Sequence, residues 1–119
     1  MLAASLSCKW CEPPRATLAE NRTHFMVDKP HPTNPAVLLV TRRHVESPFE
    51  LTAEEWADLG AMVEEARSYL TRYSPTGFTL GWNVGEAGGQ HVFHAHMHVI
   101  CRFDGEPQTG RGLRDFVLR

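Results

Sequence analysis

The chain has 119 residues, which suits one domain with a single core, and we predict one domain over residues 1–119. Its formal net charge of -2 argues against a broad basic surface for a nucleic-acid polymer or an anionic lipid surface. No run approaches the ~20 apolar residues of a membrane helix, and residues 1–7 are too short and uncharged for a signal peptide. We therefore expect no membrane partner and a cytoplasmic protein.

The first half of the chain is expected to contain two strands joined by a rigid connection. Residues 23–27 read as a short strand, and residues 29–35 contain three prolines, which exclude regular structure. Residues 36–41 are almost all apolar and partly β-branched, which favours a buried strand.

One amphipathic helix is expected over about residues 53–73. Thr52 can cap its first turn together with Glu55, three residues later, in a capping box. Apolar residues then recur at intervals of three and four, which predicts a buried stripe. The members of that stripe are Trp56, Leu59, Val63, Ala66, Leu70 and Tyr73.

The second half is expected to add two more strands, at residues 78–84 and 92–102, on either side of a glycine-rich turn at 85–90. Strands, one helix and then strands, without βαβ alternation, predict an α+β fold with an antiparallel sheet.

Three histidines alternate along the last predicted strand. With a period of two, His94, His96 and His98 share one face, and the residues between them are apolar. The simplest interpretation is a half-exposed strand with solvated imidazoles. Burial of one unpaired imidazole would cost a few kcal/mol, so such a row should be partnered by other histidines, a metal or a ligand.

Two kinds of chemistry fit three adjacent imidazoles. They are zinc ligands in many proteins, and a neutral imidazole can also attack phosphorus while its neighbours hold the phosphate oxygens. The surroundings favour phosphorus, because Gly88 and Gly89 can bring backbone amides close to an anion and Asn83 can hydrogen-bond a sugar or phosphate.

Residues 89–100, Gly-Gln-His-Val-Phe-His-Ala-His-Met-His-Val-Ile, resemble the signature of the histidine triad (HIT) superfamily. Residues 83–90 resemble the loop before the triad, and residues 38–44 resemble the family's second-strand segment. The resemblance runs from about Cys8 to Arg102 and implies a HIT-like fold, generally a homodimer whose two sheets join.

The resemblance assigns roles to the histidines. His96 would be the nucleophile that forms a nucleotidyl-histidine intermediate, His98 would contact the phosphate, and His94 would orient the pair. Gln90 would stabilise the phosphoryl oxygens beside Gly89. This chemistry requires no metal at phosphorus.

The resemblance also implies two nucleotide contacts further away. Asn83 would hold the α-phosphate region, and Asp28 falls where the family binds the ribose hydroxyls. A lone aspartate at a strand end is as readily explained as a turn residue, and that alternative stays open for Asp28.

Cys8 and Cys11 have the spacing of metal ligands, although inert thiols and a redox pair are alternatives. Many microbial HIT proteins resemble this chain in having such a pair. Their other two zinc ligands correspond to His44 and His94, which implies a closed structural zinc site.

The chain departs from the family pattern at three places. Pro35-Ala36 replaces a Gly-His pair, so a fourth histidine is missing, and His24 and His31 are interpreted as loop or surface residues. His91 replaces a hydroxyl residue, where an imidazole would protonate the leaving group or point elsewhere. The stretch after residue 102 is short and carries weak secondary-structure signals.

The leading hypothesis is a nucleotide hydrolase or transferase that releases a nucleoside monophosphate, with a purine nucleotide as substrate. Its substrate would be a nucleoside phosphoramidate, an acyl-nucleotide or a dinucleoside polyphosphate. The alternatives are a non-catalytic nucleotide-binding protein and a metal-dependent hydrolase that uses the triad as ligands.

Overall fold

A computed structural model describes residues 8–117, which form one antiparallel sheet of five strands with one long helix. The strand order is β1-β2-β3-β5-β4, and every neighbouring pair is antiparallel. The strands are β1 (Ala19–Glu20), β2 (His24–Lys29), β3 (Ala36–Thr41), β4 (Gly77–Gly81) and β5 (His96–Arg102). The predicted α+β architecture is confirmed.

The long helix α1 (Ala53–Leu70) continues into the 3₁₀ turn η2 (Thr71–Tyr73), as predicted, and Thr52 and Glu55 form the capping box. The predicted stripe is partly wrong, because Trp56 and Tyr73 are 46% and 39% exposed. The buried line of α1 consists of Glu55, Leu59, Met62, Ala66 and Leu70. It differs from the prediction by one residue at two places, with Glu55 instead of Trp56 and Met62 instead of Val63.

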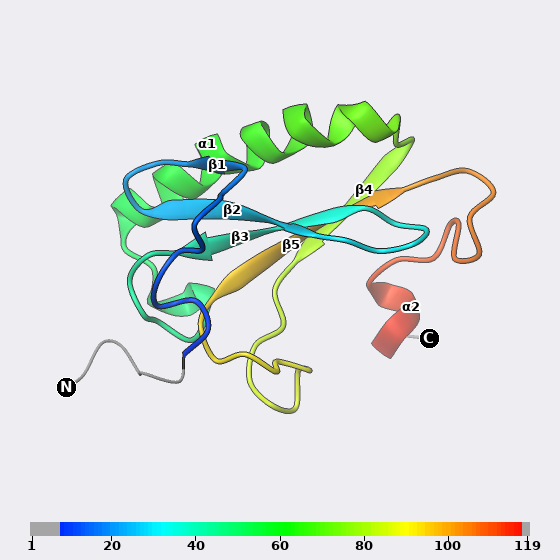
Figure 1. Ribbon diagram of the computed structural model, residues 1–119. Coiled ribbons are helices and arrows are strands. Elements are labelled where there is room, and N and C mark those ends of the chain that lie inside the picture. The colour runs from blue at the N-terminus through cyan, green and yellow to red at the C-terminus, as the bar shows by residue number, and fades with distance from the viewer. Residues whose placement is uncertain (1–7, 118–119) are drawn as a thin grey trace.

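Both faces of the sheet are covered, but by different parts of the chain. Figure 1 shows α1 lying along one side, with the loop after β4 and the short helix α2 (Arg114–Val117) on the other. The second side also carries a cavity, and we therefore call it the open face. On this face Trp10 packs on Phe25, Val27, Leu38 and Val40. Because β3 is covered on both faces, all six of its residues are buried, which explains its unbroken apolar sequence.

The 3₁₀ helix η1 (Pro48–Glu50) and the start of α1 are tied to the chain after β3. Arg43 donates from Nε and Nη2 to the two carboxylate oxygens of Glu55, at 3.1 and 2.8 Å. The hydrogen bond with Arg43 lowers the pKa of Glu55. This pair fixes the segment that carries His44 against the first turn of the helix.

Three predicted strand limits are wrong. β5 begins at His96 rather than at residue 92, and residues 92–94 are bends. β4 ends at Gly81, so Asn83 lies in the following loop, and β2 extends to Lys29, so Asp28 lies inside a strand. Within residues 8–117 no helix is both long and apolar enough to cross a membrane.

Candidate active site and metal centre

Two cysteines and two histidines from distant parts of the chain converge beside the start of β5. Cys8 and Cys11 come from the N-terminal loop, His44 follows β3, and His94 lies two residues before β5. Their ligand atoms all lie within 4.8 Å of one another. The structure thus brings together all four predicted ligands, and the cluster could hold a metal ion.

His94 is the central residue of this cluster and is completely buried. Its Nε2 lies 2.6 Å from the carbonyl oxygen of Thr41, to which it can only donate. That hydrogen bond leaves the lone pair on Nδ1, the nitrogen that faces the sulfurs and lies 3.2 Å from Nδ1 of His44. His94 is therefore oriented as a metal ligand, and it lies before the first residue of β5.

The same residue also contacts the next histidine through its backbone. His96 Nδ1 lies 2.7 Å from the carbonyl oxygen of His94, so Nδ1 is the protonated nitrogen and Nε2 carries the lone pair. Burial lowers the pKa of His96, although its hydrogen bond to the His94 carbonyl opposes that shift. A neutral imidazole with a free Nε2 is the form that can attack an electrophile.

His98 lies beside His96 on the same face of β5, and their ring centroids are 5.3 Å apart. Burial, with smaller effects of His96 and Lys29, lowers the pKa of His98 to about 4. His98 is therefore neutral at pH 7. Its Nε2 is buried and has no hydrogen-bond partner among the described residues, and such an orphaned polar atom indicates a place for a ligand group.

The glycine-rich loop is held by Gln90, whose side chain is 5% exposed. Its Oε1 accepts from the Gly85 amide at 2.8 Å, and its Nε2 donates to the carbonyls of Glu46 and Val92 at 2.7 and 3.1 Å. Both ends of this amide thus bond within the protein. The predicted contact of Gln90 with phosphoryl oxygens stays a prediction, and the structure shows it as the residue that shapes the loop.

The sequence suggested that Gly88 and Gly89 bring backbone amides close to an anion, but in the structure both of these amides donate within the loop. The amides of Gly88 and Gly89 donate to the carbonyls of Gly85 and Glu86, at 3.1 and 3.0 Å. Gly89 has a φ of 91° and approaches Asn83, whose Cγ would lie 3.8 Å from an added Cβ. The glycines therefore permit a tight turn that places Gly89 against Asn83.

Replacement of Gly88 with alanine is expected to impair the site without unfolding the domain. An ideal Cβ there would lie 2.3 Å from the carbonyl oxygen of Val84, a backbone atom, so the loop must shift. We expect kcat/KM for nucleotide substrates to fall by about tenfold or more, because small misplacements of positioning groups are costly. Steady-state kinetics and a thermal melt measure the two effects.

Gly60→Ala is the matched control, because an added Cβ at that position in α1 meets nothing within 4 Å. It should leave kcat/KM unchanged and raise stability by roughly 0.5–1 kcal/mol. Wild-type kinetics for Gly88→Ala would contradict the proposed role of the loop geometry.

A large cavity extends from the histidines along the open face. Its lining includes His98 and Asn83, together with Lys29 at the end of β2 and His31 in the β2–β3 connection. Part of the remaining lining comes from the segment 106–116. The positive charge of Lys29 also contributes to the lowered pKa values of His96 and His98, although burial is the main cause.

Asp28 is not part of this lining. Met26 on β2 packs on the α1 side of the sheet, and alternation places Asp28 on that same side. The pKa of Tyr69 on α1 is raised mainly by burial and slightly by the charge of Asp28, which agrees with that position. The residue that sequence reasoning missed is its neighbour Lys29, which the extended limit of β2 turns toward the cavity.

Two histidines outside the triad occupy different environments. His24 was interpreted as a loop or surface residue, but it is 1% exposed, and its Nδ1 lies 2.9 Å from Oγ1 of Thr23. His91 is exposed and is not among the residues that line the cavity.

The sequence pattern of the HIT domain matches residues 12–105, most of the chain. The chain therefore belongs to the HIT domain family. It is 35% identical over 92 residues to the AP-4-A phosphorylase of Mycobacterium tuberculosis, which covers 75% of this chain and 47% of that protein. It is 33% identical over 86 residues to the bifunctional bis(5'-adenosyl)-triphosphatase/adenylylsulfatase FHIT of Arabidopsis thaliana, with 71% and 48% covered. The chain spans about half the length of these curated relatives.

Solved structures share the fold. A member of the HIT family from Bacillus subtilis superposes with a TM-score of 0.69 at 26% identity, covering 83% of this chain and 75% of that one. SMU.412c from Streptococcus mutans UA159 gives a TM-score of 0.74 at 22% identity, covering 95% and 76%. The expected HIT-like fold is thus confirmed.

Proposed function

We propose that the protein is a nucleotide hydrolase or transferase that cleaves at the α-phosphate of its substrate and releases a nucleoside monophosphate. The observation that carries this proposal is the hydrogen bond from His96 Nδ1 to the His94 carbonyl at 2.7 Å. It leaves the Nε2 lone pair of a neutral imidazole available beside the orphaned Nε2 of His98. The relatives named as a phosphorylase and a triphosphatase of adenosine nucleotides agree with this class of chemistry.

The reaction follows from this arrangement in two displacements. Nε2 of His96 forms a bond to the α-phosphorus, and the bond from phosphorus to the leaving group breaks with its electron pair. Water or another acceptor then attacks the same phosphorus, the bond to His96 breaks, and the nucleoside monophosphate leaves. Two displacements divide one difficult transfer into easier steps, and the enzyme contributes positioning and charge stabilisation.

The groups around the phosphate have separate tasks in this proposal. Nε2 of His98 contacts a phosphoryl oxygen, and Asn83 hydrogen-bonds the α-phosphate region from the loop beside Gly89. Lys29 adds the positive charge that attracts the nucleotide to the cavity. The leaving group is an amine, an acyl group or a nucleotide, and we propose a purine as the base.

We propose zinc as the ion of the Cys8, Cys11, His44 and His94 cluster. A tetrahedral ion about 2.3 Å from sulfur and about 2.0 Å from nitrogen separates sulfur from nitrogen by about 3.5 Å and two nitrogens by about 3.3 Å. The four S···N distances here are 3.1 to 3.7 Å, and the N···N distance is 3.2 Å. A closed set of four protein ligands suits a structural role, and no step at phosphorus passes through the ion.

We also propose that the protein is a homodimer in the cytoplasm. The support for a dimer is that β4 is one of the two edge strands of the sheet and lies next to the partly exposed pair Trp56 and Trp82, whose ring centroids are 5.9 Å apart. An unpaired edge next to exposed aromatic rings is suited to join a second copy of the sheet.

Intact mass spectrometry tests the covalent mechanism directly. The protein is mixed with adenosine phosphoramidate or a dinucleoside polyphosphate and quenched rapidly at extreme pH. The expected result is an added adenylyl mass that peptide mapping assigns to His96. If AMP appears with no adduct at any mixing time, the mechanism is a direct displacement. If neither adduct nor AMP appears across the substrate classes, the protein is a nucleotide-binding protein without catalysis.

A further inference from the structure

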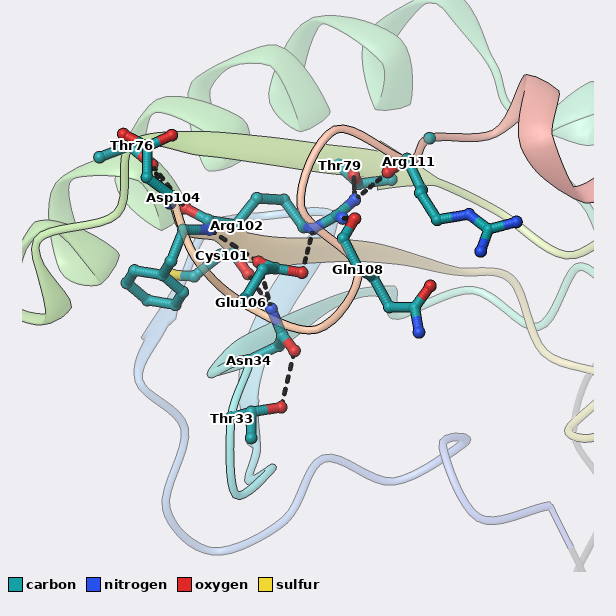
Figure 2. A network of polar contacts seen from close by, with 12 residues as sticks. Thr33, Asn34, Thr76, Thr79, Cys101, Arg102, Asp104, Glu106, Gln108 and Arg111 are labelled. Atoms are coloured by element: carbon teal, nitrogen blue, oxygen red, sulfur yellow. Dashed lines mark hydrogen bonds and ion pairs between the residues drawn. The ribbon is translucent and has the colours of Figure 1, made fainter.

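The segment after β5, for which the sequence predicted little, is anchored to the open face by one arginine. Arg102 donates from Nε to Glu106 Oε1 at 3.0 Å and from Nη1 to Thr79 Oγ1 at 3.0 Å. It also donates to the backbone carbonyls of Gln108 and Arg111, at 2.6 and 2.7 Å. Figure 2 shows these bonds meeting at the guanidinium of Arg102. The guanidinium thus holds the loop of residues 102–111 together from its first residue to its last.

The second anchor of this segment is Glu106, whose side chain is 4% exposed. Its Oε2 accepts from Asn34 Nδ2 at 2.8 Å and from the Phe103 amide at 2.7 Å. Asn34 also donates to the Cys101 carbonyl at 2.9 Å, so the β2–β3 connection, β5 and the last segment share one network. Such a saturated network fixes residues 102–111 as a rigid part of the fold.

This anchored segment contributes one wall of the cavity that also contains His98. Residues of the segment 106–116 line the same cavity as the β2–β3 connection, and Ala36 and Ile100, which pair between β3 and β5, also line it. Two large apolar side chains on this wall are strongly exposed, Leu113 at 64% and Phe116 at 90%. Figure 2 also shows the Arg111 guanidinium pointing away from the network.

We propose that residues 106–116 form the wall for the nucleobase, and that Phe116 stacks on the base of the bound nucleotide. Arg102 and Glu106 act as positioning residues for that wall. The inference rests on the proposed function in one respect, namely that the nucleotide phosphate lies at His98.

Three features of the cavity support this occupant. One continuous cavity joins His98 and Asn83 to Phe116, so a phosphate bound at His98 directs the attached nucleoside along it. The side chains of Ala36, Ile100 and Leu113 add apolar surface, which suits the flat faces of a base. An aromatic ring left exposed on a wall of the cavity is the kind of platform on which bases stack without base-specific hydrogen bonds.

Binding of two probes that differ only by the base tests the proposal. Isothermal titration calorimetry gives the Kd of AMP and of ribose 5-phosphate for the full chain and its variants. Phe116→Ala is expected to raise the Kd of AMP by about fivefold or more, because loss of one base–aromatic stack has that size of effect. It should leave the Kd of ribose 5-phosphate unchanged, and Phe116→Trp should retain AMP binding.

Phe49→Ala is the matched control, because Phe49 is 85% exposed and does not line the cavity. It should change neither Kd. An unchanged Kd of AMP in Phe116→Ala, or an equal loss for both probes, would overturn the proposal, because either result shows that the ring does not contact the base.

The outcomes also separate this inference from the proposed function. An adenylyl adduct on His96, together with an unchanged Kd of AMP in Phe116→Ala, keeps the covalent mechanism and rejects the base wall. A base-dependent loss at Phe116 without any adduct supports the wall and rejects the covalent mechanism.

Discussion

Replacement of His96 with alanine is expected to lower the turnover of a nucleoside phosphoramidate by at least about 10⁴-fold, because the variant lacks the nucleophile. The bond to the His94 carbonyl presents the Nε2 lone pair of His96, and no neighbouring group can replace it. His98 is neutral at pH 7, but it is positioned beside the reacting group rather than oriented by a carbonyl. Chromatographic measurement of released nucleoside monophosphate gives the rate.

Two comparisons make this result specific. His96→Ala should bind AMP with nearly the wild-type Kd, because the side chain that is lost serves the reaction more than ground-state binding. His98→Ala should lose roughly 10²- to 10³-fold in kcat, the size expected for one group that stabilises phosphoryl oxygens. Turnover of His96→Ala within about tenfold of the wild type would contradict a nucleophilic role.

Loss of the metal ligands is expected to have the largest effect on stability. Cys11→Ala should eliminate stoichiometric zinc, measured by atomic emission, and should lower the melting temperature by about 10 °C or more. The reason is that the cluster joins the N-terminal loop to His44 and to the chain before β5, three segments that are distant in sequence. Chelation of the wild-type protein should produce the same shift in melting temperature.

The same variant should also lower kcat, because His94 positions the carbonyl that orients His96. Cys101→Ala is the matched control, since Cys101 is buried in the core on the α1 side and is not part of the cluster. It should retain zinc. If the purified wild-type protein contains no metal and chelators do not change its melting temperature, the structural zinc site is contradicted.

The sequence predicts those parts of the structure that have a strong local signal. The capping box at Thr52 and Glu55 sets the start of α1, and the apolar run of β3 reflects burial on both faces. The cysteine spacing and the family resemblance together predict that Cys8 and Cys11 lie close to His44 and His94, and the structure brings these four residues together. These features depend on short-range patterns or on one specific motif.

Other features depend on contacts that a linear pattern does not contain. The predicted strand included His94, but β5 begins two residues later, at His96, and the Thr41 carbonyl and the metal cluster hold the side chain of His94. Asp28 was predicted as a ribose contact from its place in the family pattern. Because β2 extends to Lys29 rather than ending at residue 27, Lys29 instead of Asp28 lies on the open face. A shift by one residue reverses the face of a strand side chain.

The way Arg102 holds the last segment has a consequence for how related enzymes can diverge. Two of its four partners, at Gln108 and Arg111, are backbone carbonyls, which every amino acid supplies. The side chains at positions 107–111 can therefore change without loss of those two bonds. Substitutions in this stretch can therefore change the lining of the cavity while His96 and His98, on β5, stay in place. A single arginine thus allows the cavity wall to change independently of the two histidines.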